Sequence, residues 1–287
     1  TITWTAKDLA DNTSTATSTV TVQDTTAPAV TAPANSSFQA IASLTPLTTL
    51  DYGNATATDA VGVVSLTNNA PASFPVGATT ITWTARDLAG NTGTATSTVT
   101  LQDTIAPAVT PPANTTFEAT APLTLLTAGD YGNATATDAV GVVSLTNDAP
   151  LLFPVGMTTI TWTAKDLAGN TGTAISTVTV QDTIAPVVAA PASATFEATA
   201  PLTPLTTADY GDATATDAVG VVSLASNAPA TFPVGNTTIL WTAKDLAGNT
   251  GTATTTITVQ DTIAPAVTAP ASATFEATAP LTPLTTA

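Results

Sequence analysis

Residues 159–180, TITWTAKDLAGNTGTAISTVTV, decide the fold of this chain. Polar and apolar residues alternate up to Lys165, which is the period of a half-buried β-strand and turns Trp162 inward. The alternation returns in 173–180, after the turn residues of 166–170, where Gly and Asn tolerate a positive φ. Two alternating runs around a short turn predict an antiparallel hairpin.

Short strands and turns are also predicted upstream of this hairpin. Residues 133–137 form one strand, entered through an Asp130-Tyr131-Gly132 turn, and residues 142–145 form another. No window shows sustained helical periodicity, so no helix is predicted. The last strand is expected to contain Ile175, Thr177 or its neighbours, Val178 and Val180. Ala164 is expected to point inward, and the predicted core is Trp162, Ile160, Val142, Leu145, Phe153, Val155, Val178, Val180 and Phe117.

The whole chain repeats with a step of 79 residues. Trp4, Trp83, Trp162 and Trp241 keep this step without an insertion or deletion. A unit of this size matches one small β domain and is too long for a solenoid repeat. The predicted domains are a hairpin of a truncated repeat at 1–23, whole repeats at 24–102, 103–181 and 182–260, and the first part of a further repeat at 261–287.

Short strands with turn signals every 8–12 residues in a domain of this size indicate a two-sheet sandwich. The predicted fold class is therefore all-β, with tandem immunoglobulin-like β-sandwich domains arranged end to end.

The composition excludes several classes of function. The chain has 287 residues, 20 acidic and 4 basic side chains, no His and no Cys. Four cations cannot neutralise a phosphate backbone, so nucleic-acid binding is not expected. Without His or Cys there is no thiol nucleophile and no Ser-His pair, and no apolar run is long enough to span a bilayer. No enzymatic activity is predicted.

The repeat resembles the hyalin repeat (HYR) family and related bacterial immunoglobulin-like repeats. The resemblance rests on Asp-Thr-Ile-Ala-Pro at 103–107, Ala-Thr-Asp at 136–138, Phe-Pro-Val-Gly at 153–156, and 158–166 with Gly169-Asn170. It implies an immunoglobulin-like sandwich used in extracellular adhesion or as a stalk. Many eukaryotic members of the family carry a Cys pair, and its absence here favours a microbial surface protein.

Each repeat carries Asp at recurrent turn positions that allow two interpretations. A turn Asp accepts nearby backbone N–H bonds, which is a purely structural role. In an immunoglobulin-like sandwich, however, Asp103, Asp138 and Asp166 are expected at the same end of the domain, together with Asn170. Three carboxylates close together repel one another, and a Ca²⁺ ion with six to eight oxygen ligands relieves the repulsion. The tentative inter-domain Ca²⁺ ligands are Asp24, Asp59, Asp87 and Asn91; Asp103, Asp138, Asp166 and Asn170; and Asp182, Asp217, Asp245 and Asn249.

Other charged positions are interpreted as structural. Asp130 is interpreted as a turn residue away from this cluster. Glu118, Glu197 and Glu276 are matched by Gln39, and they are interpreted as solvated positions. The four cations share one repeat position, and Lys165 there is expected to point outward.

The sequence indicates a structural repeat region of a long secreted microbial surface protein. The expected form is a stiff extracellular fibre, stalk or filament, with other copies of the same chain as partners. The alternative is an adhesin-type module that binds a glycan or cell-surface receptor through its domain-end loops. The loops at 138–141 and 166–170 recur in the other repeats, which favours the structural role.

Overall fold

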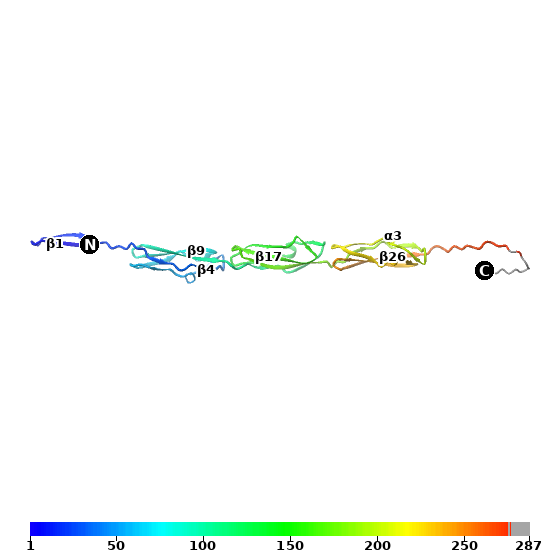
Figure 1. Ribbon diagram of the computed structural model, residues 1–287, viewed down its shortest axis with the longest axis horizontal. Coiled ribbons are helices and arrows are strands. Elements are labelled where there is room, and N and C mark those ends of the chain that lie inside the picture. The colour runs from blue at the N-terminus through cyan, green and yellow to red at the C-terminus, as the bar shows by residue number, and fades with distance from the viewer. Residues whose placement is uncertain (275, 277–287) are drawn as a thin grey trace. The chain divides into compact units, whose positions relative to one another are not determined.

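A computed structural model describes residues 1–274 and 276 of the chain (Figure 1). The chain divides into two compact units, one with residues 1–117 and 123–180, and one with residues 118–122 and 181 onward. The predicted partial repeat at 261–287 lies partly outside the described residues, and 261–274 contain no strand. The described helices are single turns of four residues, none of which could cross a membrane.

The second repeat shows the architecture of all three. One layer is a four-stranded sheet in the order β12-β18-β17-β15, and the other consists of the pairs β11-β14 and β13-β16. The elements are β11 (Ala108–Thr110), β12 (Thr115–Glu118), β13 (Leu123–Leu125), α2 (Ala128–Tyr131), β14 (Thr135–Thr137), β15 (Val142–Asn147), β16 (Leu152–Pro154), β17 (Gly156–Asp166) and β18 (Thr171–Gln181). This arrangement confirms the predicted immunoglobulin-like β-sandwich.

The other two repeats have the same element order. The first contains β3 (Ala29–Thr31), β4 (Ser36–Gln39), β5 (Leu44–Thr45), α1 (Thr49–Tyr52), β6 (Thr56–Thr58), β7 (Val63–Asn68), β8 (Phe74–Pro75), β9 (Gly77–Asp87) and β10 (Thr92–Gln102). The third contains β19 (Val187–Ala189), β20 (Ala194–Glu197), β21 (Leu202–Thr203), α3 (Thr207–Tyr210), β22 (Thr214–Thr216), β23 (Val221–Ser226), β24 (Phe232–Pro233), β25 (Gly235–Asp245) and β26 (Thr250–Gln260). A hairpin of β1 (Ile2–Lys7) and β2 (Thr13–Ser18) precedes them.

The hairpin predicted from 159–180 is confirmed. Strands β17 and β18 pair antiparallel from Gly156 opposite Val180 to Lys165 opposite Thr171. Trp162 is 2% exposed, and its indole Nε1 donates to Ser176 Oγ at 2.9 Å. The buried indole therefore keeps its one polar group satisfied, as a buried Trp requires.

The predicted core is correct for the central residues and wrong at Val155. Phe153, Ile160, Val178 and Val180 are at most 1% exposed, and Phe117, Val142 and Leu145 are half-buried. Ile175 is 62% exposed because a strand that turns Val178 and Val180 inward turns every odd-numbered residue outward. Val155 is 40% exposed because it lies at the corner between the end of β16 at Pro154 and the start of β17 at Gly156, outside the alternation of either strand.

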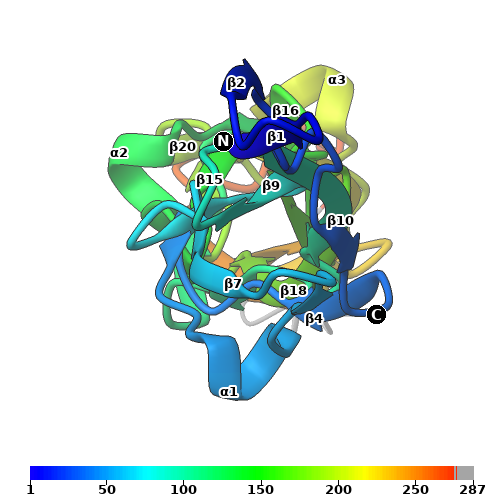
Figure 2. The same ribbon diagram turned by 90° about the vertical axis from the view of Figure 1, so that its left-hand side faces the viewer.

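A helical turn stands where the sequence predicted an Asp130-Tyr131-Gly132 turn. Thr127 N and Oγ1 both donate to Asp130 Oδ2 at 2.8 Å, which caps α2. The turn buries Tyr131, whose ring centroid lies 5.6 Å from that of Phe153. Figure 2 shows the equivalent helix α1 at the outside of the first repeat. Asp130 is thus a capping residue, and a single capped turn is too short to show helical periodicity.

Gly172 in β18 allows the backbone of Pro107, just before β11, to approach β18 closely. An added Cβ at this position would lie 1.9 Å from Pro107 O, and the equivalents Gly93 and Gly251 meet Pro28 O and Pro186 O at 1.9 and 1.8 Å. Only glycine fits between these two backbones.

The indole hydrogen bond yields a first prediction. Ser176→Ala leaves the buried Trp162 Nε1 without an acceptor and should destabilise the second repeat by about 1–3 kcal/mol. Hydrogen exchange of the β17 amides measures the change. Ser176→Thr is the matched control, because Thr255 Oγ1 accepts from Trp241 in the third repeat at 3.1 Å. Equal exchange rates in Ser176→Ala and the unaltered chain would contradict the prediction.

The glycine contact yields a second prediction. Gly172→Ala forces Pro107 away from β18 and should cost about 1–3 kcal/mol, as overpacking of a tight contact does. Gly129→Ala is the control, since the third repeat has Ala208 at the equivalent position of its helical turn. Urea unfolding followed by tryptophan fluorescence should show a lower midpoint for the first variant and an unchanged or higher one for the second.

Candidate metal centre

Three acidic clusters occupy equivalent places in the three repeats. In the second repeat, Asp103 directly follows β10, Asp138 directly follows β14, and Asp166 is the last residue of β17. One carboxylate oxygen from each of these residues lies within 4.8 Å of the others. The same holds for the sets Asp24, Asp59, Asp87 and Asp182, Asp217, Asp245. The structure therefore brings together all nine Asp residues that the sequence singled out, in three groups of three.

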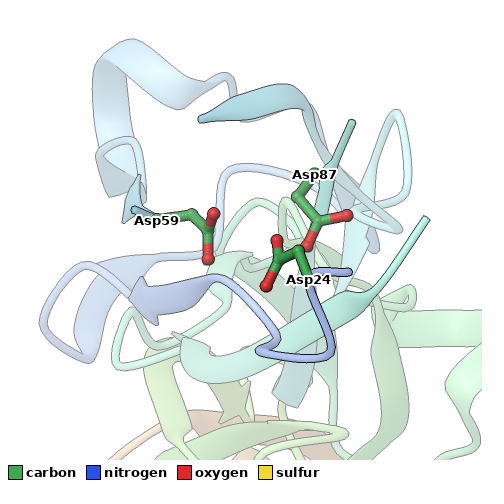
Figure 3. Close-up of side chains that lie close together, drawn as sticks. All are labelled: Asp24, Asp59 and Asp87. Atoms are coloured by element: carbon green, nitrogen blue, oxygen red, sulfur yellow. The ribbon is translucent and has the colours of Figure 1, made fainter. Parts of the chain in front are cut away.

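Figure 3 shows the first of these clusters. Asp24, Asp59 and Asp87 come from three separate segments, and their carboxylates turn toward one another. Asp87 is 1% exposed, and the other two are half-buried. Converging carboxylate oxygens form the type of ligand set that hard cations prefer.

Asp166 is the most strongly held member of its cluster. Its Oδ1 accepts from Gly169 N at 2.7 Å and Asn170 N at 2.8 Å, and its Oδ2 accepts from Asn170 Nδ2 at 2.8 Å. Burial opposes ionisation of this carboxyl, but the hydrogen bonds of Asn170, Gly169 and Ala168 outweigh burial and lower its pKa. The pKa values of Asp87 and Asp245 are lowered in the same way. Asp166 is therefore ionised at neutral pH.

Asn170 joins the cluster as a hydrogen-bond donor. Besides Asp166, its Nδ2 donates to Asp103 O at 3.1 Å and Ile105 O at 3.4 Å. Asn91 and Asn249 make the same contacts with the start of their own repeats. Each Asn thus ties the loop between the two long strands to the beginning of its repeat and positions two of the three Asp residues. Cation ligation by these Asn side chains stays a prediction.

Asp138 belongs to a turn that also contributes an apolar contact. Its Oδ1 accepts from Val140 N at 2.8 Å and Gly141 N at 3.1 Å. Val140 packs against the hydrophobic core of the first repeat, which includes Leu101 and Ala40. One short turn therefore links the acidic cluster of the second repeat to the interior of the first.

The first Asp of each cluster is the member whose charge is least compensated. The Oδ2 oxygens of Asp24, Asp103 and Asp182 are buried without a hydrogen-bond partner among the residues that the structure describes, and Asp103 and Asp182 are 8% exposed. Burial raises the pKa of Asp182, and the neighbouring carboxylates of Asp217, Asp245 and Glu118 raise it further, against one backbone bond from Ile184. A buried, unpaired carboxylate oxygen is costly unless a proton or a cation meets it.

One functional position was missed by the sequence analysis. Glu118 was interpreted as solvated, but it is half-buried and accepts from Thr183 N at 2.6 Å and from Thr183 Oγ1 at 2.9 Å. Glu197 holds Thr262 in the same way, at 2.7 and 2.8 Å. The available signal was the constant spacing of 65 residues between this acidic position and a Thr that follows the repeat's first Asp. The position is a clamp on the start of the following repeat.

The basic position of each repeat points outward, as the sequence predicted. Lys165, Arg86 and Lys244 are exposed, on the opposite face of their strands from the buried Trp residues. Lys7 forms an ion pair with Asp11, which is exposed.

Comparison with known proteins identifies the repeat. The HYR domain family matches residues 23–101, 102–180 and 181–259. The chain belongs to the HYR domain family. Each of its three complete HYR domains contains one of the acidic clusters.

Two curated relatives are similar over most of the chain. Hyalin of Strongylocentrotus purpuratus is 36% identical over 278 residues, which are 90% of this chain and 23% of that protein. Hyalin of Lytechinus variegatus is 36% identical over 286 residues, which are 93% of this chain and 54% of that protein. The chain thus spans about half or less of the length of these relatives.

Among solved structures, the chain is similar to cadherin repeats. Mouse cadherin-23 EC22-24 matches 82% of this chain and 99% of its own, at 14% identity and a TM-score of 0.30. Drosophila N-cadherin EC1-4 matches 82% of this chain and 76% of its own, at 13% identity and a TM-score of 0.30. Likeness at this level carries no argument about the site.

The lowered pKa of Asp166 predicts a pH dependence. A carboxyl whose pKa is depressed by folding stabilises the fold above the unfolded value of about 3.9 and loses this effect as the pH falls through the folded value. In EDTA, Asp166→Asn should therefore destabilise the second repeat at pH 7, and the difference should shrink as the pH falls below about 4. Urea midpoints at pH 7 and at acidic pH test this. The control is Asp148→Asn, since Asn69 and Asn227 accept the equivalent backbone bond.

Asp182 should behave with the opposite sign. Its raised pKa means that the ionised form is disfavoured in the folded state, so the charge destabilises the fold at neutral pH and the penalty falls as protons bind. In EDTA, Asp182→Asn should raise the urea midpoint at pH 7 and lose this advantage as the pH is lowered toward 4. A variant that is less stable than the unaltered chain at pH 7 would contradict the raised pKa.

Proposed function

We propose that this chain is the stiff spacer region of an extracellular, adhesion-type surface protein of a microbe, and that Ca²⁺ bound at the acidic clusters fixes its joints. The observation that carries the proposal is the recurrence of one three-carboxylate cluster at the start of every complete repeat. Membership in the HYR family supports the adhesion-type role.

The contacts at the start of the second repeat support a joint of limited freedom. Gln39 of the first repeat donates from Nε2 to Asp103 Oδ1 at 3.3 Å and accepts from Thr104 Oγ1 at 2.7 Å. Ala40 N donates to Gln102 O at 2.8 Å, next to the first residue of the second repeat. Together with the packing of Val140, these contacts restrict the freedom of the connecting segment.

A Ca²⁺ ion would supply the positive charge that compensates the clustered carboxylates at this joint. Three carboxylates with oxygens within 4.8 Å of one another repel, and the unpartnered oxygen of Asp103 adds a desolvation cost. A divalent cation converts both penalties into attraction, and oxygen atoms are its preferred ligands. Since Asp103, Asp138 and Asp166 lie on three separate segments, a bound cation ties these segments together. The Asn170 brace already places two of them, which reduces the ordering that binding requires.

The loops around the cluster favour a spacer over a binding module with varied specificity. The sequence Asp-Ala-Val-Gly recurs at 59–62, 138–141 and 217–220, and Asp-Leu-Ala-Gly-Asn recurs at 87–91, 166–170 and 245–249. Identical loops present identical surfaces. The alternative of a module that binds a glycan or surface receptor has one observation in its favour, the exposure of Leu88, Leu167 and Leu246 at 74–77% beside the clusters.

The calcium hypothesis predicts a metal-dependent stability. A cation present at a hundredfold excess over its Kd stabilises the domain that binds it by about 2.7 kcal/mol. Addition of Ca²⁺ to the chelated chain should therefore raise the thermal midpoint by several degrees. Asp138→Asn keeps the acceptor for Val140 and Gly141 and removes one charge, so it should abolish the rise in the second repeat. Asp148→Asn, which removes a charge outside the cluster, should retain it.

Two outcomes would overturn the proposal. An identical midpoint in Ca²⁺ and in EDTA contradicts the metal site. An unaltered radius of gyration in small-angle scattering when Ca²⁺ replaces EDTA, at a bound stoichiometry of one per cluster, contradicts the role in stiffening.

A further inference from the structure

We infer that the acidic clusters are unequal cation sites, and that the residue at the clamp position, Gln39 or Glu118, sets the difference. The cluster around Asp182 has Glu118 beside it as a fourth carboxylate and binds Ca²⁺ more tightly than the cluster around Asp103, which faces the neutral Gln39. This inference rests on the proposed binding of Ca²⁺, and it adds which residue makes the Ca²⁺ affinity differ between clusters.

The clamp residue lies next to the first Asp of the cluster. At the Asp103 cluster, Gln39 Nε2 donates to Asp103 Oδ1 at 3.3 Å, and Gln39 Oε1 accepts from Thr104 Oγ1. At the Asp182 cluster, both carboxylate oxygens of Glu118 accept hydrogen bonds from Thr183, the residue directly after Asp182. The two side chains thus occupy equivalent places, and Glu118 contributes to raising the pKa of Asp182.

The hydrogen bonds around the first Asp differ accordingly. Asp103 Oδ1 accepts two bonds, from Gln39 Nε2 and from Ile105 N at 3.2 Å. Asp182 Oδ1 accepts from Ile184 N at 3.3 Å, and the residue at the clamp position offers it no donor because a carboxylate only accepts. Both retain a buried Oδ2 without a partner among the described residues, and both are more than nine-tenths buried. The Asp182 cluster therefore carries one more negative charge and one donor fewer.

The charge difference acts on cation affinity directly. The affinity of Ca²⁺ sites is set in part by the number of charged ligands, and one additional carboxylate at a half-buried site should tighten binding by about tenfold. Gln39 also competes, because its amide donates to Asp103 Oδ1 and so weakens the attraction of that carboxylate for a cation. Glu118 has no such donor, and its hydrogen bonds to Thr183 hold the carboxylate in place.

The test isolates one cluster at a time in the full chain. Asp59→Asn with Asp217→Asn leaves the Asp103 cluster intact, and Asp59→Asn with Asp138→Asn leaves the Asp182 cluster intact. Each substitution keeps the acceptor for its own turn, as with Asp217 Oδ1, which accepts from Val219 N at 2.8 Å. Calorimetric titration with CaCl₂ then gives one Kd for each cluster. We expect the Asp182 cluster to bind about tenfold more tightly.

Reciprocal variants assign this difference to the clamp residue. Gln39→Glu should tighten the Asp103 cluster by about tenfold, and Glu118→Gln should weaken the Asp182 cluster by the same factor. Glu197→Gln is the matched control, since Glu197 makes the same clamp with Thr262 and should leave the Asp182 cluster unchanged. Because Gln39→Glu predicts a gain, a folding defect cannot imitate its effect.

Two results are decisive against the inference. Equal Kd values for the two clusters, with no response to Gln39→Glu or Glu118→Gln, would overturn the grading and leave the proposed calcium role intact. The absence of any binding heat in both backgrounds and in the unaltered chain would instead overturn the proposed calcium role itself.

Discussion

Both the fold and the site depend on which residues of strand β17 face the core. Along this strand the even-numbered residues face the core, and Ile160, Trp162 and Ala164 are at most 2% exposed. The next inward position is Asp166, which is 1% exposed at the end of the strand. A single register thus buries the indole that anchors the sandwich and the carboxylate that anchors the acidic cluster, because side chains alternate strictly across a strand.

A buried carboxylate at the end of a core strand requires compensation, and the chain supplies it locally. The loop 166–170 turns its backbone N–H groups and the Asn170 amide toward Asp166, which lowers the pKa of that carboxyl. The same amide reaches the carbonyls of Asp103 and Ile105 and so fixes the start of the repeat. The charge that remains without compensation belongs to the first Asp of each repeat, which is why the proposed cation binds there.

The repeats are nearly identical in architecture, so their few differences carry the information about function. Ser176 and Thr255 accept the same indole hydrogen bond, and Asp148 and Asn227 accept the same backbone bond. These exchanges conserve a hydrogen bond. The exchange of Gln39 for Glu118 changes the charge beside an acidic cluster, and it is therefore the exchange that we connect with a difference in binding.

The sequence by itself determined the 79-residue period, the β class, the central hairpin and the identity of the nine clustered Asp residues, because alternation and repetition are local properties of the chain. Only the tertiary structure decided that Ile175 faces outward, that Tyr131 is buried by a helical turn, and that Glu118 clamps Thr183. The orientation of Ile175 depends on whether the opposite sheet covers the odd-numbered or the even-numbered residues of β18. The others depend on contacts between residues far apart in the sequence, which no local pattern encodes.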